Sequence, residues 1–175
     1  MKMATTYYFL PTRNLFGEDS VNEAGTLMKS LGGKKVMIVT DSFLASSGMA
    51  GQIQQILSEA GLESVIFDGA EPNPKDTNVE AGMEVFRKNG CDSIISLGGG
   101  SSHDCAKAIG LIAANGGKIS DFEGVDKSSN PMCPLIAINT TAGTASEITR
   151  FCIITDTSRH VKMAIVDWRV TPQIA

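Results

Sequence analysis

The sequence predicts an α/β fold: a Rossmann-like, doubly wound and mostly parallel sheet with an added antiparallel hairpin. Short apolar runs alternate with helical segments every ~30 residues, which is typical of βαβ units. These runs are continuous and lack strict alternation with polar residues, as in strands that helices cover on both faces. Two later apolar runs flank a short polar connector in place of a helix, and they predict the hairpin.

The first predicted unit is a strand over 35–40 followed by a helix over 42–60. The strand is a short apolar run, and Asp41 at its end is a suitable N-cap for the helix. Gly61 ends the helix, because glycine readily adopts the left-handed conformation of a helix C-terminus.

The second unit is a strand over 64–67 and a helix that Asp76 or Thr77 caps and that lasts to about Lys88. A rigid Pro-Asn-Pro loop over 72–74 separates the strand from the helix. An Asn-Gly pair then closes the helix.

The third unit is a strand over 93–97 that runs directly into a glycine-rich turn over 98–101. A helix over 102–114 follows, ended by Asn-Gly-Gly, and a fourth strand is predicted over 134–139.

The remaining predicted strands lie near the two ends of the sequence. The hairpin pairs 151–155 with 161–166 across the connector 156–160. A further strand, at an edge of a sheet, is expected over 6–10.

Length and composition indicate one globular domain over 1–175. Lys and Arg number 15 and Asp and Glu 19, and the net charge of −4 argues against nucleic acid or an anionic membrane as partner. No apolar run approaches the ~20 residues of a membrane span. Residues 1–10 lack the apolar core of a signal peptide. We therefore expect a soluble, cytoplasmic protein.

The cysteines and histidines argue against a metal site built by this chain alone. The four cysteines include no C-x-x-C pair, so neither a disulfide framework nor a cysteine-based zinc site is expected. His103 and His160 are the two histidines, too few for a three-histidine site. We interpret Cys105 and Cys152 as core thiols and His160 as a solvated residue of the hairpin turn.

The strongest local signal is the turn formed by Gly98, Gly99, Gly100 and Ser101 between a strand and a helix. Glycines let the backbone approach a ligand closely, and the free N–H groups at a helix start attract phosphate. The alternative interpretation is a tight turn with Ser101 as a plain cap. The pattern is neither the Rossmann G-x-G-x-x-G fingerprint nor a P-loop.

Two further segments follow predicted strands at the same edge of the sheet. Asp41 either accepts hydrogen bonds from a ribose or serves only as a helix N-cap. The segment 139–147 carries four hydroxyl groups and small residues that could line a ligand. The alternative there is a loop with a helical turn capped by Thr144 or Ser146.

His103 and Asp104 come directly after the glycine-rich turn. Asp104 in the first turn of a helix favours the positive end of the helix dipole, which is a sufficient structural reason for it. His103 as a catalytic base would need a substrate within reach, so catalysis is the minor interpretation of this residue.

Six blocks of the sequence occur in an order and spacing that is highly specific: Phe16-Gly17, Val39-Thr40-Asp41, Phe67-Asp68-Gly69, Glu71-Pro72-Asn73-Pro74, Gly98 to Asp104, and Asn139 to Thr149. Over essentially its whole length the chain resembles the iron-dependent (group III) alcohol dehydrogenases, most closely their bacterial alcohol and propanediol dehydrogenase branch. Ser102 departs from the pattern, since many relatives have Pro there. Serine should loosen the turn slightly without removing a phosphate donor.

The resemblance implies an NAD-binding site and assigns its residues. The turn from Gly98 to Ser101 would hold the NAD pyrophosphate, and Asp41 would face the adenosine ribose. An acid at this position favours NAD over NADP, because a 2′-phosphate would meet a like charge. Asn73 would lie beside the cofactor. The other residues implied to contact it are Asp104, Thr140, Thr141, Thr144, Thr149, Phe151 and Lys162.

The resemblance also implies a metal that this chain does not bind. Members of the family are much longer, and an all-helical second domain binds Fe2+ or another divalent metal through one Asp and three His. We expect that domain and its ligands to be absent from residues 1–175. The resemblance therefore assigns no catalytic and no metal-binding residue here, and the isolated chain is expected to be inactive, because the metal polarises the alcohol oxygen.

Three interpretations of function stay open. The first is the NAD-binding half of a homo-oligomeric dehydrogenase that moves a hydride between NAD and a primary alcohol or aldehyde. The second is a free-standing NAD-binding module, or a truncated fragment, without turnover. The third is a related metal-dependent family, such as dehydroquinate synthase or glycerol dehydrogenase, which shares the glycine-serine turn. The block from Thr140 to Glu147 favours the alcohol dehydrogenases.

Overall fold

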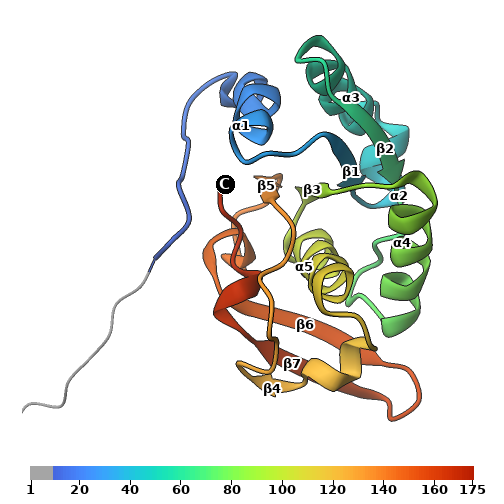
Figure 1. Ribbon diagram of the computed structural model, residues 1–175. Helices are drawn as coiled ribbons and strands as arrows, with labels where there is room; N and C mark the ends of the chain where they lie inside the picture. Colours follow the sequence, from blue (N-terminus) through green and yellow to red (C-terminus); the bar gives the residue numbers. More distant parts are fainter. Residues whose placement is uncertain (1–9) are drawn as a thin grey trace, which may run out of the picture.

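The main sheet is built from four short strands. The computed structural model describes residues 10–175, in which these strands are β1 (Lys35–Val39), β2 (Glu63–Phe67), β3 (Ser93–Gly98) and β5 (Leu135–Asn139). All pairs are parallel, and the order is β2-β1-β3-β5 (Figure 1). Met37 pairs with Val65 on one side and Ile94 on the other. The predicted parallel sheet is confirmed.

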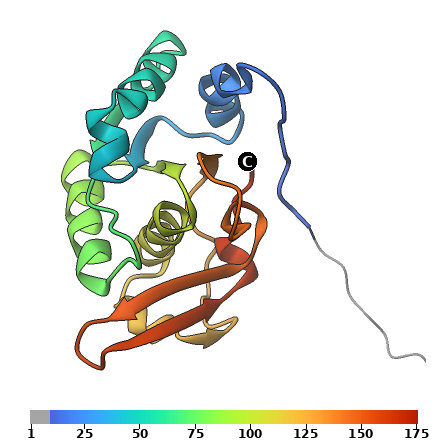
Figure 2. The same cartoon turned by 180° about the vertical axis from the view of Figure 1, so that it is seen from behind.

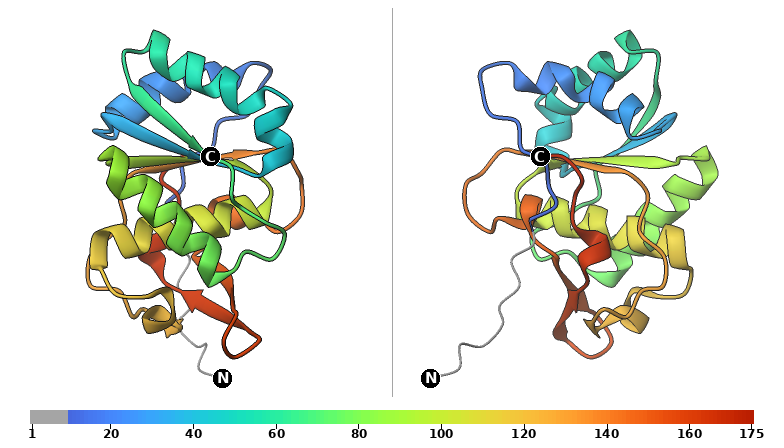
Figure 3. Two further views of the ribbon diagram at one scale, coloured as in Figure 1. Left: turned by 90° about the vertical axis from the view of Figure 1, so that its right-hand side faces the viewer. Right: turned by 60° about the vertical axis from the view of Figure 1, so that its left-hand side comes forward.

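Helices cover both faces of this sheet, as Figure 3 shows. Successive side chains of a strand point to opposite faces, so Val36 and Ile38 belong to one cluster of buried residues and Met37 and Val39 to another. Helices α1 (Ala24–Ser30) and α3 (Met49–Glu59) contribute to the first cluster. Helices α4 (Asp76–Asn89) and α5 (Gly100–Asn115) contribute to the second. The sheet is therefore doubly wound.

The predicted hairpin is also confirmed, and it belongs to a second sheet. Strands β6 (Phe151–Asp156) and β7 (Val161–Val166) are antiparallel, and β4 (Gly124–Val125) joins β7 in parallel. Helix α5 lies between the two sheets (Figures 1 and 2). Cys105 faces the same cluster as Cys152 of β6, and both are buried, as expected of core thiols.

Three local predictions need correction. The helix expected over 42–60 is two helices, α2 (Ser42–Ser46) and α3, because Gly48 between them has a φ of 89° and breaks the helical hydrogen-bond ladder. The helix expected over 102–114 begins at Gly100, so Ser101 lies inside its first turn and does not cap it. Of the strand expected over 6–10, all but Leu10 lies outside the described residues, and Leu10 is not in a strand.

The segment 20–30 forms helices that the sequence analysis did not anticipate, a 3₁₀ turn over Ser20–Glu23 and then α1. A signal was present, because Ala24, Leu27, Met28 and Leu31 follow helical spacing and join the core cluster. Further 3₁₀ turns span Ile119–Phe122, Ser146–Ile148 and Trp168–Val170. Within residues 10–175, no helix has the length and apolarity needed to cross a bilayer.

Candidate functional site

A pocket of about 800 Å³ opens at the carboxyl ends of β1, β2 and β3. The chain continues from β1 toward β2 on one side and from β3 toward β5 on the other, so the winding of the sheet reverses between β1 and β3. Ligands of doubly wound sheets bind outside the strands at this reversal. The lining residues are Asp41, Ser42, Phe43, Phe67, Asp68, Gly69, Ala70, Glu71, Pro72, Asn78, Ala81, Gly99, Gly100, Ser101, Ser102 and Thr141.

The glycine-rich turn forms one wall of this pocket. Gly98 ends β3 with a φ of 144°, a value that favours glycine, and Gly99 is the N-cap of the 16-residue helix α5. Gly99 has no side chain to accept a hydrogen bond, so no side chain of the N-cap satisfies the first N–H groups of α5. This end of the helix carries positive partial charge. The wall can therefore bind an anionic group such as phosphate.

The threonine loop, which we define as residues 140–145, packs against the same turn. A Cβ atom added to Gly99 would lie 2.7 Å from Thr141 Oγ1, and one added to Gly100 would lie 2.5 Å from Thr144 Oγ1. Neither threonine could stay in place beside a larger residue. The consecutive glycines thus have a second cause besides ligand approach, which is the close packing of this loop.

Asp41 caps a helix and also lines the pocket. Its Oδ1 atom accepts a hydrogen bond from Leu44 N at 2.8 Å, so Asp41 is the N-cap of α2, and that interpretation is confirmed. Its side chain also lines the pocket opposite the glycine-rich turn. A carboxylate at this position can accept further hydrogen bonds from a ligand.

Asn73 and Lys162 meet outside the lining of this pocket. Lys162 Nζ donates to Asn73 Oδ1 at 2.6 Å, and both side chains are exposed. Asn73 has a φ of 54°, in the left-handed region that asparagine tolerates better than most residues. Thr155 N donates to Pro74 O at 2.7 Å and fastens this loop to β6. The structure thereby joins two predicted site residues that are far apart in the sequence.

A buried lysine holds the segment that follows the threonine loop. Lys107 of α5 is fully buried, and its Nζ atom donates to Ser146 Oγ, Thr149 O and Phe151 O at 2.8, 2.9 and 2.8 Å. Asp104, one turn earlier, accepts from Ser146 Oγ at 2.7 Å and from Ile153 N at 3.2 Å. One helix thus carries both the glycine end and the anchors of the neighbouring segment.

Burial dominates the electrostatics of this anchor. It lowers the pKa of Lys107 to about 8, although Asp104 opposes the shift. Burial also raises the pKa of Asp104, while the hydrogen bond from Ser146 and the charge of Lys107 oppose that rise. Each charged form is stabilised by the hydrogen bonds it makes, because a buried charge without partners is very costly.

His103 is enclosed beneath the turn. Its side chain is fully buried, its Nδ1 atom lies 2.8 Å from Ser96 Oγ, and its Nε2 atom lies 2.6 Å from Asn139 Oδ1. Both ring nitrogens are engaged within the protein, which argues against the minor interpretation of His103 as a catalytic base. His160 is exposed in the hairpin turn, as expected.

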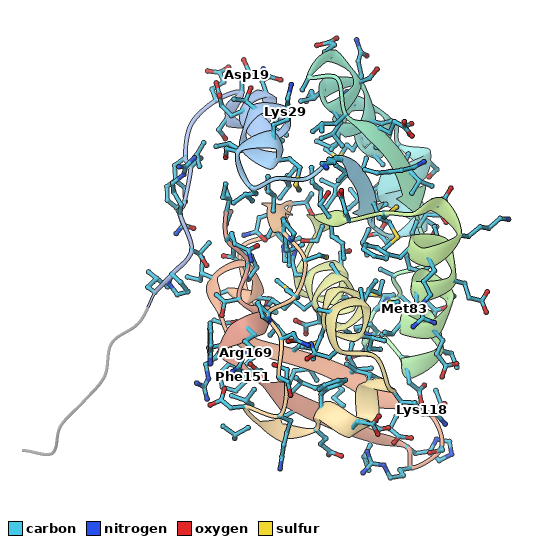
Figure 4. All side chains as sticks on the ribbon, viewed as in Figure 1. Asp19, Lys29, Met83, Lys118, Phe151 and Arg169 are labelled. Atoms are coloured by element: carbon cyan, nitrogen blue, oxygen red, sulfur yellow. The ribbon has the colours of Figure 1, made fainter. Side chains whose placement is uncertain are left out.

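The remaining predicted site residues lie around the rim. Thr140 lines a groove between α3 and the end of β5 and does not line the main pocket. Phe151, at the start of β6, is half exposed beside the segment that carries Arg169 (Figure 4). The backbone oxygens of Thr149 and Phe151 accept hydrogen bonds from Lys107, which is a structural role.

Several residues of the site were not anticipated. Lys107 interrupts an apolar helical run, and a lysine in such a run is a signal that it has buried partners. Phe43 lines the pocket without any local pattern that marks it, and Asp68 also lines it, although the block Phe67-Asp68-Gly69 was given no role there. No three or more His, Cys, Asp or Glu side chains of residues 10–175 come together where they could hold a metal ion.

Comparison with known proteins gives a family and close relatives. Residues 11–175 match the family model described as iron-containing alcohol dehydrogenase. The chain is 49% identical over 170 residues to an NAD-dependent methanol dehydrogenase of Bacillus methanolicus, covering 97% of this chain and 45% of the relative. It is 48% identical over 170 residues to a 1,3-propanediol dehydrogenase of Citrobacter freundii, covering 96% and 44%. The chain spans about half the length of these curated relatives.

Solved structures agree with the sequence comparison. A crystal structure of a 1,3-propanediol oxidoreductase superposes with a TM-score of 0.94 at 46% identity, covering 98% of this chain and 45% of that one. A sulfoacetaldehyde reductase of Bifidobacterium kashiwanohense, solved in complex with NAD+, gives a TM-score of 0.88 at 31% identity, with coverage of 99% and 46%.

Proposed function

The chain belongs to the iron-containing alcohol dehydrogenase family, and from this premise we propose that it is the NAD-binding part of a metal-dependent alcohol dehydrogenase. The proposed reaction is transfer of a hydride between NAD and a primary alcohol or aldehyde. Relatives named for methanol and propanediol support small primary alcohols as the substrate class.

One observation carries the proposal: the glycine end of α5 opens, without a side-chain cap, into a pocket that also contains Asp41. Free N–H groups at a helix start bind phosphate, and a carboxylate at the end of a neighbouring strand accepts hydrogen bonds from a ribose. The pocket of about 800 Å³ falls within the size range of cofactor sites.

The residues present fit NAD. In this proposal Gly99, Gly100 and Ser101 bind the pyrophosphate through backbone N–H groups, and Asp41 accepts from the ribose hydroxyls. The negative charge of Asp41 favours NAD over NADP, since a 2′-phosphate would be repelled. The remaining proposed contacts are Gly98, Asn73, Asp104, Thr140, Thr141, Thr144, Thr149, Phe151 and Lys162.

NAD, when bound, supplies the hydride acceptor, and the chain's own residues bind and orient it. The metal of the family does not fit the described residues, because residues 10–175 contain no cluster of ligating side chains. We therefore derive no step through a metal here. The domain that would bind it, a homo-oligomeric assembly and a cytoplasmic location stay predictions.

A second candidate function is an NAD-binding module without turnover. It is favoured by residues 10–175, among which no three or more His, Cys, Asp or Glu side chains come together to hold a metal ion. Both candidates predict NAD binding and differ in hydride transfer. Formation of NADH from a primary alcohol with added iron, zinc or manganese separates them when it is measured on the protein isolated from its natural source, because the isolated chain is expected to be inactive in both cases. Turnover by a pure 175-residue chain would contradict our expectation that the isolated chain is inactive.

Titration calorimetry tests NAD binding directly. We expect NAD and ADP-ribose to bind in the presence of a chelator, because the proposed contacts need no metal. Gly51→Ala is the control for substitutions in the glycine-rich turn, and it should bind NAD like the parent. Gly51 is exposed in α3, and an added Cβ would meet no atom within 4 Å. Absence of binding at millimolar NAD by a folded sample would refute the proposal.

A further inference from the structure

We propose that His103 is a positioning residue, whose imidazole ties β3 to the end of β5 and so sets the threonine loop against the glycine-rich turn. His103 does not contact the cofactor in this proposal. The inference rests on the proposed function, because the site it serves is the dinucleotide pocket.

The hydrogen bonds place the proton of the neutral imidazole. Asn139 Oδ1 can only accept, so His103 Nε2 carries the proton and donates to it at 2.6 Å. His103 Nδ1 lies 2.8 Å from Ser96 Oγ and, in the neutral ring that burial favours, accepts from that hydroxyl. Both ring nitrogens are then satisfied.

The three hydrogen-bonded residues, Ser96, His103 and Asn139, surround the glycine-rich turn. Ser96 lies in β3 two positions before Gly98, and His103 follows the turn in α5. Asn139 is the residue of β5 that pairs with Gly98, and Thr140 N donates to Gly98 O at 3.0 Å. The imidazole therefore connects the strand before the turn, the helix after it and the strand that leads into the threonine loop.

A role in packing alone does not account for this arrangement. Ser96 and His103 are both fully buried, and burying polar groups is costly, whereas an apolar pair of similar size would fill the space without that cost. Asn139, in contrast, is exposed and lines the groove beside α3 together with Thr140. The buried pair thus fixes the orientation of a side chain at the surface.

The surroundings keep the imidazole neutral. Burial lowers the pKa of His103, and the charge of Lys107 lowers it further, while the hydrogen bond to Asn139 and the charge of Glu147 oppose the shift. Near neutral pH the ring can therefore accept from Ser96 and donate to Asn139 at the same time.

Two substitutions at His103 separate positioning from packing. His103→Gln keeps an N–H donor near the place of Nε2, whereas His103→Leu has a similar size and no donor. We expect His103→Leu to weaken NAD binding about tenfold or more and His103→Gln to change it about threefold or less, since an unpaired buried group costs ~1–3 kcal/mol. His160→Asn, in the exposed turn, is the control and should change nothing.

A second measurement does not depend on NAD. Amide hydrogen exchange of residues 140–145 should be faster in His103→Leu than in the parent and close to the parent in His103→Gln. Imidazole nitrogen NMR should show Nε2 protonated and Nδ1 unprotonated in His103, and His160→Asn assigns the two histidine signals.

The outcomes are distinguishable. Unchanged exchange of residues 140–145 and unchanged NAD affinity in a folded His103→Leu, with lower thermal stability alone, would make His103 a packing residue and overturn the inference. A parent protein that binds no NAD would refute the proposed function. In that case the exchange and NMR results would still decide whether His103 positions the loop.

Discussion

Two strand-to-helix junctions lie at the same edge of the sheet, and they differ in whether a side chain caps the start of the helix. The N-cap residues have almost the same backbone conformation, with φ of −94° at Asp41 before α2 and −97° at Gly99 before α5. At Asp41 a carboxylate accepts from Leu44 N, whereas at Gly99 no side chain is present. The protein caps the first helix with its own side chain, whereas no N-cap side chain serves the second.

The two helices also differ in their support. Helix α2 has five residues, and of these Leu44 is buried. Helix α5 has 16 residues, lies between two sheets and is anchored by the buried side chains of His103 and Lys107. The helix without a side-chain cap is therefore the longer and more deeply buried of the two.

The largest effect should come from giving the α5 junction the cap of the α2 junction. Gly99→Asp places a carboxylate where the pyrophosphate is proposed to bind, and its Cβ would press on Thr141. We expect NAD binding to weaken by about 100-fold or more, which corresponds to ~2.8 kcal/mol. Calorimetry on the folded variant measures this.

Gly99→Ala is the matched control for that variant, because it adds the Cβ atom without the charge. It should weaken NAD binding less than Gly99→Asp does. Equal affinities of Gly99→Asp and the parent would show that the open helix end does not bind the pyrophosphate.

Removal of the α5 anchor should have the next largest effect. Lys107→Met leaves Ser146 Oγ and the backbone oxygens of Thr149 and Phe151 without their donor. We expect a loss of about 3 kcal/mol in the free energy of unfolding, as for a broken buried polar network. Chemical denaturation gives this value.

Lys88→Met, at an exposed position of α4, is the control for the lysine substitution and should change stability by about 0.5 kcal/mol or less. Similar losses in both variants would mean that the buried hydrogen bonds of Lys107 contribute little.

Asp41 variants test the role of the carboxylate at the α2 junction. Asp41→Asn keeps a side-chain oxygen for the N-cap but removes the charge, so it should raise the affinity for NADP relative to NAD by about tenfold with little change in stability. Asp41→Ala removes the cap as well and should also cost about 1 kcal/mol of stability. A ratio of NADP to NAD affinity that stays constant in both variants would leave Asp41 as a helix cap alone.

The smallest expected effect is a dependence of stability on pH from His103. Burial lowers its pKa below the ordinary value of 6.5, so below that pH the unfolded chain binds the proton more readily than the folded one. The contribution of His103 is complete above pH 6.5 and decreases as the pH falls toward the folded pKa. Melting temperatures between about pH 5 and pH 8 measure it.

His103→Gln is the reference for the pH series, because glutamine does not titrate and the other groups are common to both proteins. The parent should lose stability more steeply than His103→Gln on acidification. Parallel curves would indicate that the imidazole is not kept neutral by burial.

Much of the fold was predictable from the sequence because its signals are local. The continuous apolar runs of β1, β3 and β5 and the glycine and asparagine stops of the helices each depend on a few neighbouring residues. The break at Gly48 was missed, although glycine after two serines is itself a local signal, because the apolar spacing continues across it.

The site could be predicted only in part, because only some of its features depend on neighbouring residues. That Asp41, the glycine-rich turn and the threonine loop share one edge follows from parallel strands, and the structure shows them there. That Thr141 and Thr144 press on Gly99 and Gly100 does not follow from any pattern, because loop conformation depends on contacts with the rest of the molecule.

The parallel sheet, the order of its strands along the chain and the family can be inferred from the amino-acid sequence, because apolar periodicity, helix stops and spaced motifs are properties of short segments. Which buried polar groups meet depends on the tertiary structure. Lys107 finds its acceptors 39 to 44 positions away, and His103 finds Asn139 36 positions away. Such partners are selected by the packing of α5 between two sheets, where a polar group removed from water without a hydrogen bond is costly, and no local pattern specifies where that partner lies.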